Sequence, residues 1–386
     1  MKIGIVGASG AGLYVALMLS LSHPYDQIDL IDQKSVLGKK LLATGNGHCN
    51  LLPAKLDCSA FRNEAETKEF FGKTSLNELK SWLFDLGIML KEVNGLYYPE
   101  CYHAPTFVSY LESRLRENKV NLLLNTTMFD YRKRGDGYIL STSAGDLEYD
   151  RLIMSFGGKS HPSLGSDGSL FKIIKNHGYQ VNAMHPGLTP LKTKESTSKL
   201  DGIRHEARLK IQFNGGQYIE NGEILFKKNG LSGICVFNAS SCWVRAGKKE
   251  ASIEIDLFPD LSEEELTETL TGLMKRVGGS YLKSVFPKPL EEYIRFGALR
   301  MYGDDSPLNV VKAAKQLIFH PIDSYGFEDS QVTIGGISLD EIDLSFGSKR
   351  EKGVYFIGEC LDNDGLCGGN NLAWCLLGAK IVSDSI

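Results

Sequence analysis

The sequence lacks any apolar run that approaches the roughly 20 residues needed to cross a membrane, and it begins without a recognisable secretory signal. It also lacks an excess of basic residues, since 43 Lys and Arg against 47 Asp and Glu give a formal net charge of -4. Without a basic stripe, nucleic acid is not an expected partner. These absences predict a cytoplasmic protein that neither spans a membrane nor binds nucleic acid.

The sequence also lacks cysteines at the spacings typical of redox and metal sites. The eight cysteines contain no C-x-x-C pair and no spacing typical of zinc ligands. We therefore expect reduced, mostly structural thiols and no metal site. What remains is an ordinary globular composition, 42% hydrophobic and 23% charged, on a chain long enough for about two or three domains.

A glycine-rich segment, GASGAG, directly follows the apolar strand expected at Lys2–Val6 and opens a helix of small apolar residues. It runs from Gly7 to Gly12, and it departs from the dinucleotide fingerprint because Ser9 stands at the middle glycine position. A second apolar strand ends at Asp32, where such a fingerprint places a ribose-binding carboxylate. The unit predicts a parallel sheet, with a pyrophosphate at the helix N-terminus and the adenosine ribose at Asp32.

Each glycine of this loop has an expected purpose. Gly7 allows the tight turn, and Gly12 lets the helix pack closely on the strand. Ser9 narrows the approach of a phosphate to the backbone, although its hydroxyl is able to donate to a phosphate oxygen. Gly10 relieves the crowding that Ser9 introduces.

The first half of the chain continues with helices and strands in alternation. Leu76–Leu86 and Thr106–Glu117 are expected helices, and Asn94-Gly95 is the turn of an expected hairpin. Arg151–Phe156 is apolar enough for a central strand, closed by glycines from Gly157. This order favours an α/β domain around a parallel sheet.

The composition changes near residue 190. Residues 205–258 alternate polar and apolar side chains, which predicts a small antiparallel barrel or sandwich. Ser262 with Glu265 predicts a capped helix start, and helical signals continue to about Leu317. The chain then returns to sheet near residue 328, so the first domain is expected to be interrupted.

The last forty residues favour FAD over NAD. A strand at Val354–Ile357 is followed by Glu359, a polar residue that can hold ribityl hydroxyls, and by a glycine-bearing loop. The helix that starts near Asn370 can direct its N–H groups at the flavin, which stabilises the anion formed on accepting a hydride. A purely NAD-binding protein has no need of this returning segment.

Five motifs carry a family resemblance. They occur in order and span nearly the whole chain, at Gly38–Asn50, Gly157–Gly168, Gly222–Gly233, Val332–Asp343 and Gly353–Trp374. Together they resemble the bacterial BaiN-type flavoproteins, or NAD(P)/FAD-dependent oxidoreductases, to which aminoacetone oxidases are similar.

The resemblance implies a glutathione-reductase-type, FAD-binding Rossmann-like domain with an inserted antiparallel β-barrel domain and a small helical domain. The expected boundaries are 1–189 with 328–386, 190–260 with 318–327, and 261–317. The cofactor-binding residues, from the fingerprint and the resemblance together, are Gly7, Ser9, Gly10, Ala11, Gly12, Asp32, Gln33, Lys39, Lys40, Thr44, Gly45, Asn46, Gly47, Asn50, Met128 (through its backbone, at the adenine), Gly157, Gly358, Glu359, Asp362, Gly368, Gly369, Asn370 and Asn371.

The sequence departs from the family pattern near the expected cleft. His48 replaces an arginine, Asn46 a glycine, and Asn370 a tyrosine, while Lys227-Lys228 replace Thr-His and Ile234 a proline. His48 and Asn370 are the candidate catalytic residues. For His48 we prefer a role in orienting its loop over a role as general base. Because of these departures, the identity of the substrate cannot be inferred from the family.

Other side chains have plainer interpretations. Cys49 is expected to be a small buried thiol rather than half of a redox disulfide. Tyr97, Tyr98 and His103 either line a substrate pocket or pack in a core. Asp362 and Asp364 flank a turn, and turn chemistry accounts for them without a metal.

Three functions follow as hypotheses. The first is a flavoenzyme that passes a hydride between a small organic substrate and flavin N5, most simply an aminoacetone-oxidase-like amine oxidase that uses oxygen. The second is a reductase of unsaturated or keto compounds with NAD(P)H as a transient reductant, although no second strand–glycine–helix unit is present for that nucleotide. The third is a flavin-binding sensor or RNA-associated protein without turnover. The oligomeric state does not follow from the sequence.

Overall fold

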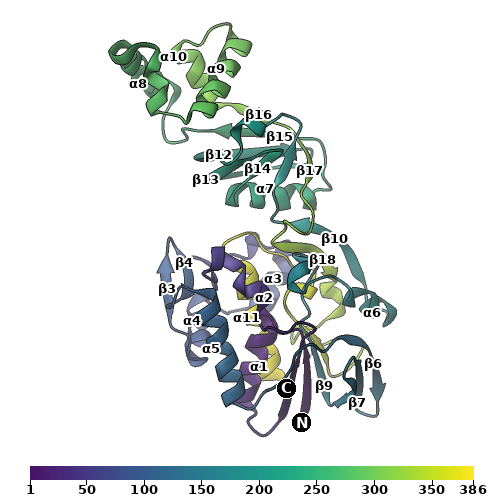
Figure 1. Cartoon of the computed structure of the whole chain (residues 1–386). Helices are drawn as coiled ribbons and strands as arrows, with labels where there is room; N and C mark the ends of the chain where they lie inside the picture. Colours follow the sequence, from purple (N-terminus) through teal and green to yellow (C-terminus); the bar gives the residue numbers. More distant parts are fainter. The chain divides into compact units, whose positions relative to one another are not determined.

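The computed structural model describes all residues, 1–386, and divides them into two compact units (Figure 1). The first unit contains Met1–His185 and Gln331–Ile386, and the second contains Pro186–Ser330. No helix in the chain is long and apolar enough for a membrane crossing.

A parallel sheet of five strands forms the centre of the first unit, in the order β19-β9-β1-β2-β5. Its strands are short, and all except the edge strand β5 are largely buried, as expected of strands covered on both faces. The strands are β1 (Lys2–Val6), β2 (Gln27–Ile31), β5 (Asn121–Leu123), β9 (Arg151–Met154) and β19 (Val354–Phe356). The predicted β1–β2 pairing and the predicted place of Arg151 in a central strand are confirmed.

Two helices that lie far apart in the sequence pack side by side on this sheet (Figure 1). They are α1 (Gly10–Ser22) and α11 (Asn370–Ser385). Their N-terminal turns are adjacent, because a Cβ added to Gly10 would lie 3.2 Å from Leu372 and 3.5 Å from the Cys375 sulfur. The residues of α1 from Gly10 to Ser20 are all buried, so this helix has no polar face, which is typical of a helix enclosed by a sheet and other helices.

The remaining elements of the first unit surround that centre. The predicted hairpin turns at Asn94 and Gly95, both with positive φ, so the prediction is confirmed. The helices are α2 (Lys39–Leu42), α3 (Glu64–Phe71), α4 (Leu76–Asp85), α5 (Ala104–Glu117) and α6 (Leu170–Asn176), and the strands are β3 (Leu90–Val93), β4 (Leu96–Pro99), β6 (Met128–Arg134), β7 (Gly137–Thr142), β8 (Gly145–Tyr149), β10 (Val181–Gly187) and β18 (Val332–Ile337).

The second unit contains a seven-stranded antiparallel sheet in the order β16-β15-β12-β13-β14-β11-β17. Its strands are β11 (Leu191–Thr193), β12 (Arg204–Phe213), β13 (Gly216–Lys227), β14 (Gly230–Ser232), β15 (Ala251–Asp256), β16 (Leu317–Phe319) and β17 (Pro321–Ser324). Its helices are α7 (Ile234–Arg245), α8 (Glu263–Val277), α9 (Lys288–Tyr302) and α10 (Pro307–Lys315). Closure of this sheet into a barrel stays a prediction, as do the domain boundaries.

One helix contradicts the sequence prediction for residues 205–258. Alternating strands were expected throughout, but α7 occupies Ile234–Arg245. Gly233 precedes it with φ of 109°, and Ala239, Ser240 and Ser241 are fully buried. The segment has no polar–apolar alternation, and its small residues allow a helix to lie close to the sheet.

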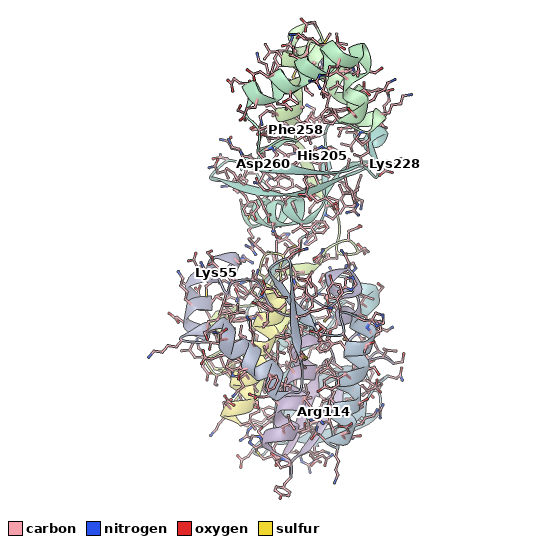
Figure 2. All side chains as sticks on the ribbon, turned by 90° about the vertical axis from the view of Figure 1, so that its left-hand side faces the viewer. Lys55, Arg114, His205, Lys228, Phe258 and Asp260 are labelled. Atoms are coloured by element: carbon pink, nitrogen blue, oxygen red, sulfur yellow. The ribbon has the colours of Figure 1, made fainter.

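The sheet and the helices α8–α10 of the second unit share one hydrophobic core. The aromatic side chains of His205, Phe258 and Phe286 pack against one another where the sheet meets these helices, with ring centroids 5.6 to 6.3 Å apart. Figure 2 labels the first two. Ser262 and Glu265 form the predicted capping box at the start of α8.

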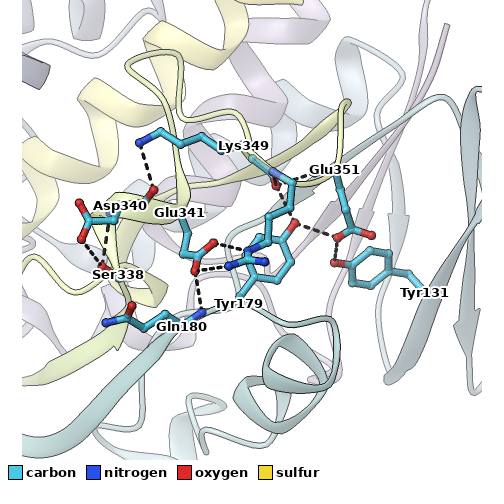
Figure 3. Close-up of polar contacts among 10 residues, drawn as sticks. Tyr131, Tyr179, Gln180, Ser338, Asp340, Glu341, Lys349 and Glu351 are labelled. Atoms are coloured by element: carbon cyan, nitrogen blue, oxygen red, sulfur yellow. Dashed lines mark hydrogen bonds and ion pairs between the residues drawn. The ribbon is translucent and has the colours of Figure 1, made fainter.

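A network of hydrogen bonds and ion pairs connects the segment after β18, which contains Glu341 and Glu351, to the rest of the first unit (Figure 3). The Arg350 guanidinium donates to both carboxylate oxygens of Glu341, at 2.5 and 3.0 Å, and the Gln180 N–H donates to the same carboxylate at 2.9 Å. The hydroxyls of Tyr131 and Tyr179 donate to Glu351 at 2.5 and 2.8 Å. The network therefore joins β6, the segment between α6 and β10, and the segment after β18.

Glu341 makes stability depend on pH. The hydrogen bond and charge of Arg350 hold the pKa of Glu341 below its usual value, although burial opposes this. A carboxyl whose pKa is lowered by folding stabilises the protein above its unfolded value, and that contribution is lost as the pH falls through the folded value. We expect Glu341→Gln to lower the urea midpoint at about pH 7 and to reduce the further loss between about pH 5 and pH 3.

The control for this experiment is Glu69→Gln, because Glu69 is exposed and has no hydrogen bond or ion pair. It should leave both the midpoint and its pH dependence unchanged. Parallel pH profiles for Glu341→Gln and the unmodified protein would contradict the prediction.

Candidate functional site

The glycine loop between β1 and α1 has a backbone that other residues cannot adopt. Gly7 has φ of 104°, and a Cβ there would lie 2.4 Å from the Ser155 carbonyl oxygen. A Cβ on Gly12 would lie 1.8 Å from the Gly7 carbonyl oxygen, far inside van der Waals contact. Both predicted purposes are therefore confirmed: Gly7 for the turn and Gly12 for close packing.

Ser9 begins α1 as its N-cap residue. Its backbone is extended, its carbonyl accepts the Leu13 N–H at 2.9 Å, and its hydroxyl makes no capping hydrogen bond. The first N–H groups of a helix have no acceptor within the helix and carry its positive end. An anion can therefore bind here, beside Gly10 and Ala11, with the Ser9 hydroxyl as an additional donor.

Asp32 connects the glycine loop to the end of β2 through hydrogen bonds. Its two carboxylate oxygens accept the Ala8 N–H at 2.7 Å and the Lys34 N–H at 2.8 Å. A carboxylate has about four acceptor positions, so Asp32 retains capacity for ribose hydroxyls. The Thr126 N–H donates to the Asp32 carbonyl at 2.9 Å, which places Met128, two residues later, near this end of the site.

The predicted second loop joins the first directly, because the Gly38 N–H donates to the Ala8 carbonyl at 2.8 Å. Two predicted cofactor residues from distant segments then pair: the Lys40 ammonium donates to Glu359 at 2.5 Å and to the Ser160 hydroxyl at 2.5 Å. Glu359 also accepts the Ser160 hydroxyl and the Thr333 N–H at 2.9 and 3.0 Å. Both oxygens of the carboxylate expected to hold ribityl hydroxyls are thus bonded to the protein.

His48 is held by Tyr102. The two rings stack with centroids 4.0 Å apart and 7° between their planes, and His48 Nδ1 lies 2.8 Å from the Tyr102 carbonyl oxygen. A carbonyl only accepts, so Nδ1 carries the proton, and in the neutral ring Nε2 is the acceptor. The contacts agree with the preferred orienting role, while a catalytic role stays a prediction.

The loop that contains His48 ends at Asn50, whose side-chain oxygen is buried and has no hydrogen-bond donor. Within this loop Gly45 and Asn46 have φ of 55° and 53°, and the Thr44 hydroxyl donates to the Leu41 carbonyl at 2.8 Å. A Cβ on Gly369 would lie 2.9 Å from the Asn50 oxygen and 2.5 Å from the Leu52 carbonyl carbon. The buried acceptor therefore lies beside the start of α11.

Asparagines shape the loop before α11. Asn370 is only 6% exposed, and its amide donates to the Leu366 carbonyl at 3.0 Å. The Asn371 amide both donates to and accepts from the Gly365 backbone, at 2.8 and 2.9 Å. These contacts give Asn370 a positioning role in the loop, and its predicted catalytic role is without direct support.

Asp362 is the centre of a buried polar cluster. It is 3% exposed, and it accepts hydrogen bonds from Arg62 at 2.6 Å, Asn182 at 2.7 Å and the Gly335 N–H at 3.1 Å. These partners lie far from Asp362 in the sequence, so no local sequence motif predicts them. Sequence reasoning missed them, as it missed Ser160 and Thr333 beside Glu359.

The remaining predicted cofactor residues surround these contacts. Gly358 has φ of 76°, and a Cβ there would lie 2.9 Å from the Ala11 side chain. Gln33 donates to the Gly165 carbonyl at 2.8 Å. The cofactor-binding roles of all the predicted residues, including Gly157, Gly368, Lys39 and Gly47, stay predictions.

Cys49 has the predicted buried environment. It is fully buried, and burial raises the pKa of its thiol to about 12. None of the eight cysteines is in a disulfide. A thiol in this environment is a poor nucleophile, so redox chemistry at Cys49 has no support.

Comparison with known proteins gives a match along the whole chain. A family model described as HI0933-like protein Rossmann domain matches residues 1–385. A 3-dehydro-bile acid delta(4,6)-reductase from Clostridium scindens is 28% identical, over 97% of this chain and 96% of the relative. Ribosomal RNA dihydrouridine synthases from Haemophilus influenzae and Escherichia coli are each 26% identical, over 99% and 96% of this chain and 97% and 94% of the relatives.

Solved structures resemble the fold at low sequence identity. The open conformation of a flavocytochrome c3 fumarate reductase aligns with a TM-score of 0.53 and 16% identity, over 99% of this chain and 77% of that chain. A 3-ketosteroid-delta4-(5alpha)-dehydrogenase from Rhodococcus jostii RHA1 aligns with a TM-score of 0.51 and 12% identity, over 100% and 96%. These likenesses support the predicted Rossmann-type fold.

Proposed function

This chain belongs to the HI0933-like Rossmann-domain family, and from that premise we propose that it is an FAD-dependent reductase of carbon–carbon double bonds conjugated to a carbonyl group. The family resemblance found in the sequence is confirmed, and the enzyme class, an oxidoreductase, agrees with the full-length relatives. The cofactor and the type of bond reduced are the proposed part.

The names of the relatives share one chemical change. A 3-dehydro steroid with double bonds at positions 4 and 6 has a carbonyl conjugated to the bonds that are reduced. Dihydrouridine is uridine with a saturated C5–C6 bond beside the C4 carbonyl. These relatives favour the reductase over the aminoacetone oxidase that the sequence analysis placed first. No comparison tests amine oxidation or the use of oxygen.

The glycine loop carries the proposal. Gly7 and Gly12 permit the close approach of strand, turn and helix, and α1 presents its N-terminus to an anion. In this assignment the first turn of α1 binds the pyrophosphate, Asp32 binds the adenosine ribose and Lys40 supports the second loop. NAD(P) shares these features, so they do not by themselves select FAD.

Asn50 supports the flavin part of the assignment. Its side-chain oxygen is a buried acceptor without a donor, and leaving such a group unpaired costs about 1–3 kcal/mol. A flavin ring carries an N–H able to pair with it, and the α11 N-terminus beside it favours negative charge. FAD held here would supply hydride transfer, with NAD(P)H as the reductant and the unsaturated substrate as the hydride acceptor.

Reduction of the double bond requires a proton at the carbon that does not receive the hydride. His48 in its imidazolium form is the candidate to donate this proton from Nε2, because the Nδ1 proton is committed to the Tyr102 carbonyl. The Leu366–Asn371 backbone, fixed by Asn370 and Asn371, keeps the start of α11 in one geometry.

Anaerobic spectroscopy tests the proposed function. The protein loaded with FAD should lose its visible flavin band on mixing with NADPH or NADH, and should regain it on adding an enone or a uridine-containing RNA. Bleaching by aminoacetone but not by NAD(P)H, with hydrogen peroxide released in air, would establish the oxidase instead. Absence of flavin bands after FAD addition would overturn the cofactor assignment.

Ser9→Leu tests the pyrophosphate end of the site. The larger side chain at the start of α1 should obstruct a phosphate and raise the Kd for FAD about tenfold or more, which corresponds to about 1.4 kcal/mol. Ser9→Ala is the matched control, and it should change the Kd less because the existing hydroxyl makes no capping bond. Equal FAD titrations of Ser9→Leu and the unmodified protein would place the pyrophosphate elsewhere.

A further inference from the structure

A surface hollow lies between α4 and the β3–β4 hairpin of the first unit. Its volume is about 490 Å³, and it is a shallow depression that is open to solvent rather than an enclosed cavity. Asn77, Lys80 and Ser81 line one part, and Phe84, Met89 and Tyr97 line another. None of these residues belongs to the proposed flavin site.

The exposed face of α4 supplies the polar side of the hollow. Asn77, Lys80, Ser81 and Phe84 follow the spacing that puts side chains on one helical face. Leu79 and Leu83, on another face, are fully buried in the core. The face with Lys80 is therefore free to contact a ligand, while the face with Leu79 and Leu83 packs in the core.

The apolar side of the hollow is unusually open to solvent. Phe84 is 72% exposed and Met89 is 66% exposed. Single exposed apolar residues are common, but two large ones lining the same hollow indicate a binding surface. A ligand that covers them would remove apolar surface from water, which favours binding.

Lys80 gives the hollow its charge preference. Its ammonium lies 3.7 Å from the centre of the Tyr97 ring and has no carboxylate partner. Glu92 accepts the Tyr97 hydroxyl at 3.1 Å and Glu78 accepts hydrogen bonds from Ser75, and neither forms an ion pair with Lys80. Asn77 and Ser81 add donors that make no hydrogen bond within the protein, so an anionic group is the complementary ligand.

We propose that this hollow binds an amphipathic carboxylate, with its apolar body against Phe84 and Met89 and its carboxylate at Lys80. A charge-assisted hydrogen bond to an ammonium suits one carboxylate oxygen, and the amide and hydroxyl of α4 suit the other. The site is independent of the proposed function. It is nevertheless near the second loop, because the Tyr97 backbone pairs with Leu51 and Leu52.

Isothermal titration of the full-length protein with decanoate tests the proposal, with decyltrimethylammonium as a ligand of similar apolar tail and opposite charge. Both are used below the concentrations at which they form micelles. Decanoate should bind more tightly than the cation. Lys80→Met should weaken decanoate binding about three- to tenfold and should not weaken binding of the cation, while Phe84→Ser should weaken both.

Lys275→Met is the control, since Lys275 is an exposed lysine of the second unit. Thermal unfolding of each variant verifies folding, and Lys80→Arg should retain most of the affinity. Equal decanoate affinities for Lys80→Met, Phe84→Ser and the unmodified protein would overturn the proposal. So would a dimer that Phe84→Ser dissociates, which would make a second copy the occupant, or vesicle binding lost in Phe84→Ser without decanoate binding.

Discussion

Gly12→Ala should yield a protein that does not retain FAD. The added Cβ would lie 1.8 Å from the Gly7 carbonyl oxygen and 2.8 Å from the Ser155 hydroxyl. The first of these atoms belongs to the backbone, so no side-chain rotation relieves the clash. Helix α1 must move away from β1, and its N–H groups then leave the position that binds a pyrophosphate.

Overpacking of this kind costs about 1–3 kcal/mol of stability, occasionally more, and the loop lies in the main core of its unit. We expect a lower midpoint in urea and an FAD Kd raised by at least about a hundredfold, or about 2.7 kcal/mol. The measurements are chemical unfolding of the apo protein and fluorescence titration with FAD.

Gly272→Ala is the matched control. Gly272 lies inside α8, and a Cβ there meets nothing within 4 Å. Alanine is favoured over glycine in a helix by up to about 1 kcal/mol, so this variant should be as stable as the original or more stable, with unchanged FAD binding. Normal FAD content in Gly12→Ala would contradict the assignment of the glycine loop.

Local signals in the sequence predicted the elements that local physics determines. The turn at Asn94-Gly95 needs two residues with positive φ, and that pair adopts them readily. Ser262 and Glu265 satisfy two backbone donors at a helix start within four residues. The fingerprint from Gly7 to Asp32 likewise lies within one βαβ unit. In each case the decisive contacts are close in the sequence.

The missed features depend on contacts between distant segments. Lys40 and Glu359 are 319 residues apart, and nothing near either residue specifies the other. The prediction for α7 was wrong because strand alternation in the flanking segments was extended across a stretch of small residues. The individual flavin contacts stay predictions, since residues such as Glu359 are bonded to the protein and the cofactor geometry follows from assembly of the whole unit.

Asp362→Ala should cause a large loss of stability that is separable from cofactor binding. Asp362 is buried, and its removal would leave the Arg62 guanidinium, the Asn182 amide and the Gly335 N–H without their acceptor. Breaking a buried charge pair by deleting one partner costs about 3–5 kcal/mol. Arg62 is 33% exposed, so water replaces part of its lost contact and the lower end of that range is expected.

A double-mutant cycle with Arg62→Met separates this structural role from the flavin contact implied by the family. If the ion pair is the main contribution, the double variant should lose less stability than the sum of the two single losses. Each single substitution breaks the same pair, so the second substitution has no further pair to break. Chemical unfolding of the apo protein measures this without any cofactor. Additive losses would show that the ion pair with Arg62 is not the main contribution of Asp362. An Asp362→Ala variant as stable as the original that nevertheless fails to bind FAD would show that Asp362 serves the cofactor rather than the fold.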